Sequence, residues 1–168
     1  MQDHSQKETF LKSYDLYSDA LFRYCFFQTS NREVALDIVQ DTFTKTWEYL
    51  AHGKQVENLR AFLYRVAGNL IIDWRRKKKA SSLDSMQESG FDIGFDEREH
   101  IENKIDGKQV FTLLELVDVK YKDVIIMRFI EEMTIPEIAS VTGESENTIS
   151  VRLHRGLEKI RKLYKEIK

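Results

Sequence analysis

Cysteine and proline are almost absent from this 168-residue sequence, and both absences narrow the possible folds. The single cysteine, Cys25, excludes a disulfide framework and a zinc site built on cysteine pairs, and it is compatible with a reducing compartment. One proline, Pro136, and seven glycines leave long stretches without a helix breaker. Because apolar residues also recur at three- and four-residue spacings, the sequence predicts an all-α protein.

Long apolar runs are missing as well. No stretch approaches the roughly 18 apolar residues of a membrane-spanning helix, and the amino terminus has no basic-then-apolar signal. We therefore expect a soluble, cytoplasmic protein with no membrane insertion.

Motifs that carry catalysis are not found either. The sequence holds no Cys/His ligand pair and no glycine-rich phosphate loop. The four histidines are scattered along the chain: His4, His52, His100 and His154. We expect no catalytic site, no metal site and no cofactor.

Charged residues of both signs are plentiful, but they are distributed unevenly. Residues 1–79 carry 13 basic and 10 acidic groups, residues 80–107 carry 2 and 8, and residues 108–168 carry 11 and 10. The middle segment is also the richest in Ser and Gly and the poorest in periodicity. The sequence thus predicts two small helical domains, 1–79 and 108–168, joined by a flexible acidic linker, 80–107.

A helix is expected to begin at Ser30, because Ser30 and Glu33 have the spacing of a capping box. Its apolar face should consist of Ala35, Ile38, Val39, Thr42, Thr46 and Leu50. Its opposite face is acidic and polar: Glu33, Asp37, Gln40, Asp41, Thr44 and Glu48. From periodicity alone, this second face is the solvated side of an amphipathic helix.

The segment NLRAFLYRVAGNLIIDWRRKKK predicts a further helix that ends in five consecutive cations, Arg75 to Lys79. Its expected core face consists of Leu59, Leu63, Val66, Ala67, Leu70 and Trp74. The cations suit a helix carboxyl end, where the macrodipole favours positive charge. They equally suit nucleic-acid phosphate, because five like charges repel one another unless something negative lies opposite.

The segment MTIPEIASVTGESENTISVRLHRGLEKIRK predicts a helix-turn-helix. Thr134 can cap a short helix that has Pro136 in its first turn and Glu137 three residues after the cap. Gly143 can adopt the left-handed conformation that ends this helix, and Ser145 can cap the next one. In the helix-turn-helix motif the second helix enters the DNA major groove.

This second helix has a dry face and a face suited to DNA. The dry face consists of Ile149, Leu153, Leu157, Ile160, Tyr164 and Ile167. The other face and its flanks carry Asn147, Thr148, Ser150, Val151, Arg152, His154, Arg155, Glu158 and Lys162. Asn and Arg can each make paired hydrogen bonds to base edges, and the other cations suit phosphates. A plain αα-hairpin with a solvated face is the alternative.

Three segments, DIVQDTFTKTWEYL, LRAFLYRVAGNLIIDWRRKK and IPEIASVTGESENTISVRLHRGLEKIRK, together resemble the bacterial RNA polymerase sigma factors of the small, two-domain extracytoplasmic-function (ECF) group. The resemblance implies an amino-terminal domain that docks on the polymerase clamp and opens the promoter's minus-ten element. It also implies a carboxy-terminal domain that reads the minus-thirty-five element. The implied partners are core RNA polymerase, through the clamp of its beta-prime subunit and the flap of its beta subunit, promoter DNA and an anti-sigma factor.

The resemblance assigns roles to particular residues. The polymerase-binding residues are Asp37, Gln40, Asp41, Thr44 and Glu48. The minus-ten residues are Asn69, Asp73, Arg75, Arg76, Lys77 and Lys78. The minus-thirty-five residues are Asn147, Thr148, Ser150, Val151, Arg152 and Arg155.

The sequence also departs from its relatives. Val117-Asp118 stands where Leu-Pro often opens the second domain, and Glu132 stands where a Gly often precedes the helix-turn-helix. Ser150 and Val151 stand where relatives often place longer polar or basic side chains, which bears on the upstream target sequence. An autonomous helix-turn-helix repressor is the alternative function, but it would leave the acidic face and the five-cation run without a role.

Overall fold

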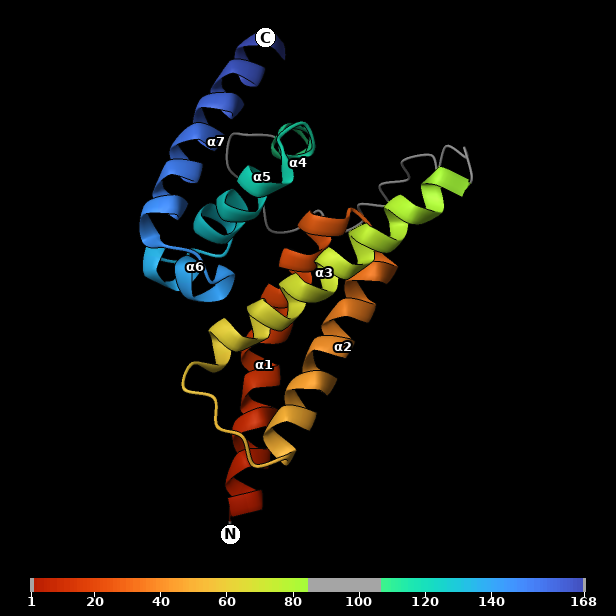
Figure 1. Cartoon of the computed structure of the whole chain (residues 1–168), viewed down its shortest axis with the longest axis vertical. Coiled ribbons are helices and arrows are strands. Elements are labelled where there is room, and N and C mark those ends of the chain that lie inside the picture. Colours follow the sequence, from red (N-terminus) through yellow and green to blue (C-terminus); the bar gives the residue numbers. More distant parts are fainter. Residues whose placement is uncertain (1, 85–106, 168) are drawn as a thin grey trace. The chain divides into compact units, whose positions relative to one another are not determined.

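The computed structural model describes residues 2–84 and 107–167, which form helices and no strand. They divide into two compact units, the first built from α1 to α3 and the second from α4 to α7 (Figure 1). Of the expected linker, residues 80–84 continue α3, Gly107 begins α4, and 85–106 lie outside the described residues. No helix of the described chain is long and apolar enough to span a bilayer.

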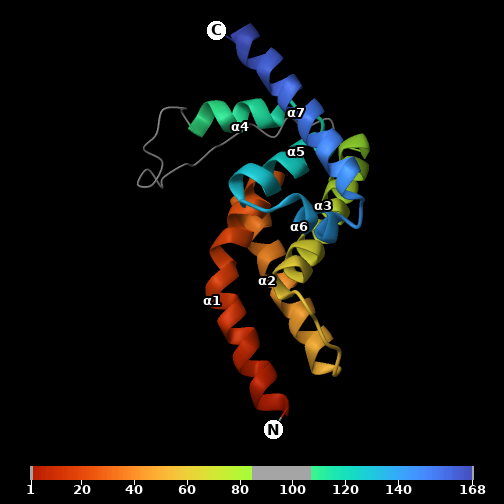
Figure 2. The ribbon, with the colours of Figure 1, turned by 90° about the vertical axis from the view of Figure 1, so that its left-hand side faces the viewer.

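The first unit consists of α1 (Gln2–Thr29), α2 (Arg32–Ala51) and α3 (Leu59–Asp84), and each of these helices packs against the other two (Figure 2). The apolar face expected for α2 is buried, together with Phe43. Two threonines on that face lie fully inside the core because their hydroxyls are satisfied within the helix. Thr42 donates to the carbonyl of Ile38, and Thr46 to that of Thr42, both at 2.7 Å.

The start of α2 differs from the prediction. Ser30 does not cap the helix, because it has a positive φ of 54° and its N–H donates to the carbonyl of Phe26, which closes the end of α1. Asn31 is the cap: its Oδ1 accepts the N–H of Val34 at 3.0 Å. Asn caps a helix as well as Ser does, and here the serine is used to turn the chain between α1 and α2.

The core face expected for α3 is partly wrong. Leu63 and Ala67 are buried as expected, but Tyr64 and Ile71 are buried too. The other four predicted positions are only half-buried: Leu59, Val66, Leu70 and Trp74. The buried stripe is rotated because Tyr64 packs edge-on against Tyr24 of α1, with ring centroids 5.2 Å apart.

The second unit consists of α4 (Gly107–Glu115), α5 (Val119–Ile125), the π-helical turn η1 (Ile126–Ile130), α6 (Ile135–Thr142) and α7 (Glu146–Ile167). Its core contains Val124, Ile126, Met133, Ile138 and Ile149, each at most 1% exposed. The Asp118 carboxylate, just before α5, accepts a hydrogen bond of 2.9 Å from Lys159 of α7.

A glycine allows α5 and α7 to approach closely. A Cβ atom on Gly156 would lie 2.8 Å from Cδ1 of Ile125 and 3.1 Å from Cβ of Tyr121. Both distances are shorter than ordinary van der Waals contacts. The crossing of these two helices therefore depends on the missing side chain at Gly156.

Candidate nucleic-acid and polymerase interfaces

The first helix of the predicted helix-turn-helix forms as expected. The Thr134 hydroxyl accepts the N–H of Glu137 at 3.3 Å, and the Glu137 carboxylate accepts the N–H of Thr134 at 2.7 Å. Pro136 occupies the first turn, where its missing N–H removes no helical hydrogen bond. Gly143 ends α6 with a φ of 73°. The predicted capping box and glycine turn are both confirmed.

The second helix, α7, begins at the predicted cap, since the Ser145 hydroxyl accepts the N–H of Thr148 at 3.1 Å. Ile149 and Leu153 are buried as expected. Farther along, the predicted dry face opens to solvent: Tyr164 is 38% exposed and Ile167 is 58% exposed. Only the first half of this face is therefore anchored in the core of the unit.

The face of α7 opposite to Ile149 and Leu153 borders a hollow of about 320 Å³, here called the reading hollow. Its lining residues are Lys120, Tyr121, Asn147, Thr148, Val151, Arg152 and Arg155. Five of the six residues predicted to contact the minus-thirty-five element thus come together, and Ser150 is exposed beside them. A concave surface lined by cations and one amide, that of Asn147, can receive phosphates and base edges.

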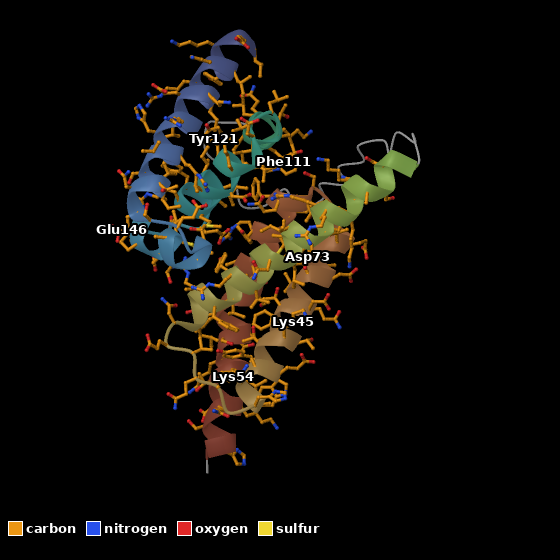
Figure 3. The ribbon with its side chains drawn as sticks, in the orientation of Figure 1. Lys45, Lys54, Asp73, Phe111, Tyr121 and Glu146 are labelled. Atoms are coloured by element: carbon orange, nitrogen blue, oxygen red, sulfur yellow. The ribbon has the colours of Figure 1, made fainter. Side chains whose placement is uncertain are left out.

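Two residues of the reading hollow have roles that the sequence did not indicate. Arg152 is half-buried and paired with Glu144, through Nη1 to Oε2 at 2.7 Å and Nη2 to Oε1 at 2.9 Å. Lys120 comes from α5, and its ammonium lies 5.0 Å from the ring centroid of Tyr121, a residue labelled in Figure 3. Lys120 is far from α7 in sequence, so no local pattern could link it to this surface.

The predicted polymerase-binding residues form one exposed face of α2. All five are exposed: Asp37, Gln40, Asp41, Thr44 and Glu48. This acidic face continues into an apolar groove of about 530 Å³, lined by Phe10, Tyr14, Leu36, Val39, Gln40, Phe43, Thr44 and Trp47. The sequence pattern of α2 alone could not indicate this groove, because half of its aromatic wall comes from α1. Phe10 packs on Trp47, and Tyr14 on Phe43, with centroids 5.1 and 4.8 Å apart.

The predicted minus-ten residues are only partly brought together on α3. Asn69, Asp73 and Arg76 are exposed on one helical face, and Arg76 lies 3.7 Å from Asp73. Lys77 and Lys78 are exposed near them. The side chain of Arg75 instead lies against α1.

The side chain of Arg75 is half-buried and bonded to α1. Its Nη2 donates to the side-chain oxygen of Gln28 and, at 3.4 Å, to the backbone carbonyl of Gln28. This arrangement ties the cationic end of α3 to α1. The guanidinium of Arg75 therefore has a partner within the first unit, unlike the exposed cations beside it in the run.

Comparison with known proteins gives the class of the chain. Residues 14–81 match the family described as Sigma-70 region 2, and residues 108–160 match Sigma-70, region 4. These regions in this order define a sigma factor of RNA polymerase. The chain is 30% identical over 140 residues to the RNA polymerase sigma factor SigV of Bacillus subtilis (strain 168), covering 83% of this chain and 81% of SigV.

Further relatives narrow the class. The ECF RNA polymerase sigma factor SigW of the same strain is 26% identical over 172 residues, covering 96% of this chain and 91% of SigW. The chain belongs to the ECF RNA polymerase sigma factors, and it directs promoter-specific transcription initiation.

Two solved structures share the fold. The sigma factor RpoE of Bartonella quintana, solved with the anti-sigma factor NepR, has a TM-score of 0.81 and 22% identity, over 94% of this chain and 98% of that chain. CnrH, solved with the cytosolic domain of CnrY, has a TM-score of 0.72 and 23% identity, over 96% of this chain and 91% of that chain.

Proposed function

We propose that this sigma factor uses three separate surfaces: the acidic face of α2 for core RNA polymerase, the exposed face of α3 for the minus-ten element, and the reading hollow for the minus-thirty-five element. The observation that carries the proposal is the reading hollow. Residues chosen from sequence alone converge there with Lys120, a cation from a different helix. A solvated αα-hairpin gives no reason for that convergence.

The α2 face suits a basic partner. Asp37, Asp41 and Glu48 are exposed on it, and opposite charges across an interface guide docking and fix its register. The clamp of the beta-prime subunit is the partner that we infer. The adjoining apolar groove can bury side chains of that partner and so add affinity to the charge pairing. For the second unit we infer a contact with the flap of the beta subunit.

At the minus-ten element we expect Asn69 to contact an unstacked base, and Arg76 with Lys77 and Lys78 to hold the phosphates beside it. Taking a base out of the stack costs a few kcal/mol, which the contacts of the pocket must offset. Arg75 acts indirectly in this scheme. By bonding to Gln28 it holds the end of α3 against α1 and so positions its neighbours.

We infer that the chain contributes recognition and no chemistry of its own, and that it works in the cytoplasm, where polymerase and promoter meet. An anti-sigma partner is a further part of the proposal. Two proteins that share its fold were solved with a bound partner, RpoE with NepR and CnrH with a domain of CnrY. An analogous partner would keep this chain from polymerase until a signal arrives.

The test is run-off transcription with core polymerase on a promoter library, comparing the parent chain with Arg155→Ala. We expect the parent to start transcripts at a defined upstream sequence. If Arg155 pairs with a base, Arg155→Ala should weaken promoter recognition by about 1–3 kcal/mol and relax the preference at one base position. If Arg155 holds a phosphate, the variant should weaken transcription from all promoters alike. Glu166→Ala, an exposed position near the end of α7, is the control. Unchanged activity and preference in Arg155→Ala would contradict our orientation of α7.

A further inference from the structure

Val151 has a chemical character unlike that of the surface around it. Its side chain is 39% exposed and lines the reading hollow. Asn147 lies one helical turn before it, and Arg155 one turn after it. Among the exposed residues of α7 from Glu146 to Lys162, Val151 is the only apolar one.

Neither the helix nor the core explains this valine. A β-branched side chain at an exposed helical position is less favourable than alanine, because its χ1 rotamers are restricted against the preceding turn. The core below is filled from other positions, since Ile149 and Leu153 are the buried side chains of this part of α7. Local stability therefore favours a different residue at position 151.

The surroundings of Val151 suggest what it contacts. Lys120 and Arg155 line the same hollow, and cations that share a surface with an apolar side chain fit DNA, whose phosphates lie beside its base edges. In the major groove, thymine is the base that presents an apolar group, its C5-methyl. Amides and guanidinium groups pair with purine edges, whereas an isopropyl group can gain only from contact with that methyl.

We propose that Val151 is a specificity-determining residue that contacts the C5-methyl of one thymine in the minus-thirty-five element. This inference rests on the proposed function of the reading hollow and adds a chemical preference to it. Asn147 and Arg155 on either side then read polar edges of neighbouring bases. A change at Val151 alters which base is preferred at one position and leaves the rest of the site unchanged.

The experiment uses the full chain with core polymerase. A promoter is first selected from a library with a randomised upstream element, and each thymine of that element is then replaced singly by deoxyuridine, which removes the methyl and keeps the base pairing. At one position we expect about a fourfold loss of promoter binding, the effect of exposing one methyl-sized apolar group. Val151→Ala should lose a similar factor on the thymine promoter and respond equally to thymine and deoxyuridine at that position.

Ile167→Ala is the matched control, because it truncates another exposed β-branched side chain of α7 that does not line the reading hollow, and it should keep the preference for thymine. The inference is overturned if no thymine is selected, if no deoxyuridine substitution matters, or if Val151→Ala retains the preference. It is also overturned if, relative to the parent chain, Val151→Ala weakens binding to the thymine and the deoxyuridine promoter by the same factor. The side chain would then contact a protein or stabilise the fold. If the Val151 inference fails but the parent chain still supports polymerase-dependent transcription, the proposed function stands. If the parent chain supports no transcription from any promoter, the proposed function is overturned as well.

Discussion

At the scale of single residues, Glu132 is held in an unfavourable backbone conformation. It is exposed and has a φ of 54°, in the left-handed region that favours glycine. Glu132→Gly should raise the free energy of unfolding of the second unit by about 1 kcal/mol, because the strain is removed. Urea denaturation measures this change. Glu132→Ala keeps the Cβ atom and should give no such gain; equal gains for Gly and Ala would locate the effect in the lost carboxylate.

The ion pair between Asp118 and Lys159 predicts a pH dependence. The hydrogen bond from Lys159 lowers the pKa of Asp118 from its ordinary value of 3.8, and the same bond raises the pKa of Lys159 from 10.5. The contribution of Asp118 to stability is therefore present above pH 3.8 and is lost as the pH falls through the lower, folded-state pKa. Asp118→Asn should be less stable than the parent at neutral pH. Denaturation at a series of pH values should show the difference in free energy of unfolding between parent and variant shrinking in acid. A difference that does not depend on pH would exclude the ion pair as its cause.

Asp41 offers a test of the polymerase face. It is exposed on α2, so Asp41→Lys should leave the helical content unchanged and weaken binding to core polymerase by repulsion from a basic partner. Binding is measured by titration with labelled polymerase. Asp19→Lys, the same charge change at an exposed site on α1, is the control. Equal affinities for the parent and both variants would remove the assignment of the clamp to this face.

At the scale of elements, two helical glycines should respond oppositely to alanine. In either helix the exchange gains about 1 kcal/mol of helix propensity. At Gly156 the added Cβ would lie 2.8 Å from Ile125 and 3.1 Å from Tyr121, and such overpacking costs roughly 1–3 kcal/mol. Gly156→Ala should therefore destabilise the second unit, and Gly68→Ala, whose nearest atom is the Tyr24 hydroxyl at 3.7 Å, should stabilise the first. Thermal unfolding of the two variants checks the signs, and a stabilised Gly156→Ala would mean that α5 and α7 can move apart.

Features that depend on a few neighbouring residues were predictable from the sequence. The Thr134 capping box, the Gly143 turn and the Ser145 cap are each set within four residues, and all three formed as predicted. Features that depend on packing between helices were not predictable. Periodicity predicts which face of a helix is buried but not which helix packs against it. It could therefore not predict that Lys120 lies beside α7 or that Arg75 bonds to Gln28. The prediction of Ser30 as the cap of α2 was wrong because the next residue, Asn31, suits the position equally well.

At the scale of the whole molecule, the segment that joins the two units is acidic, with 2 basic and 8 acidic groups in residues 80–107, and such a segment repels phosphate. We expect the chain alone to bind a promoter duplex weakly, and binding to become tight when core polymerase is added. In the proposed complex, polymerase holds both units at the promoter, so the first contact raises the effective concentration of the second. The affinity for the promoter duplex is measured by titration at fixed salt with the chain alone, with core polymerase alone and with both together. Tight, sequence-specific binding by the chain alone would contradict the proposed dependence of promoter binding on polymerase.

The pairing of Arg152 with Glu144 has a consequence for the thermodynamics of promoter binding. A guanidinium that is already paired with a carboxylate neutralises less of the charge of a phosphate, so its approach releases fewer of the cations condensed on the DNA. In the proposed complex, counterion release at the reading hollow comes mainly from Lys120 and Arg155, although three cations line its wall. In the proposed complex, the ion pair with Glu144 fixes the rotamer of Arg152 before DNA binds, so binding loses less side-chain entropy at this residue.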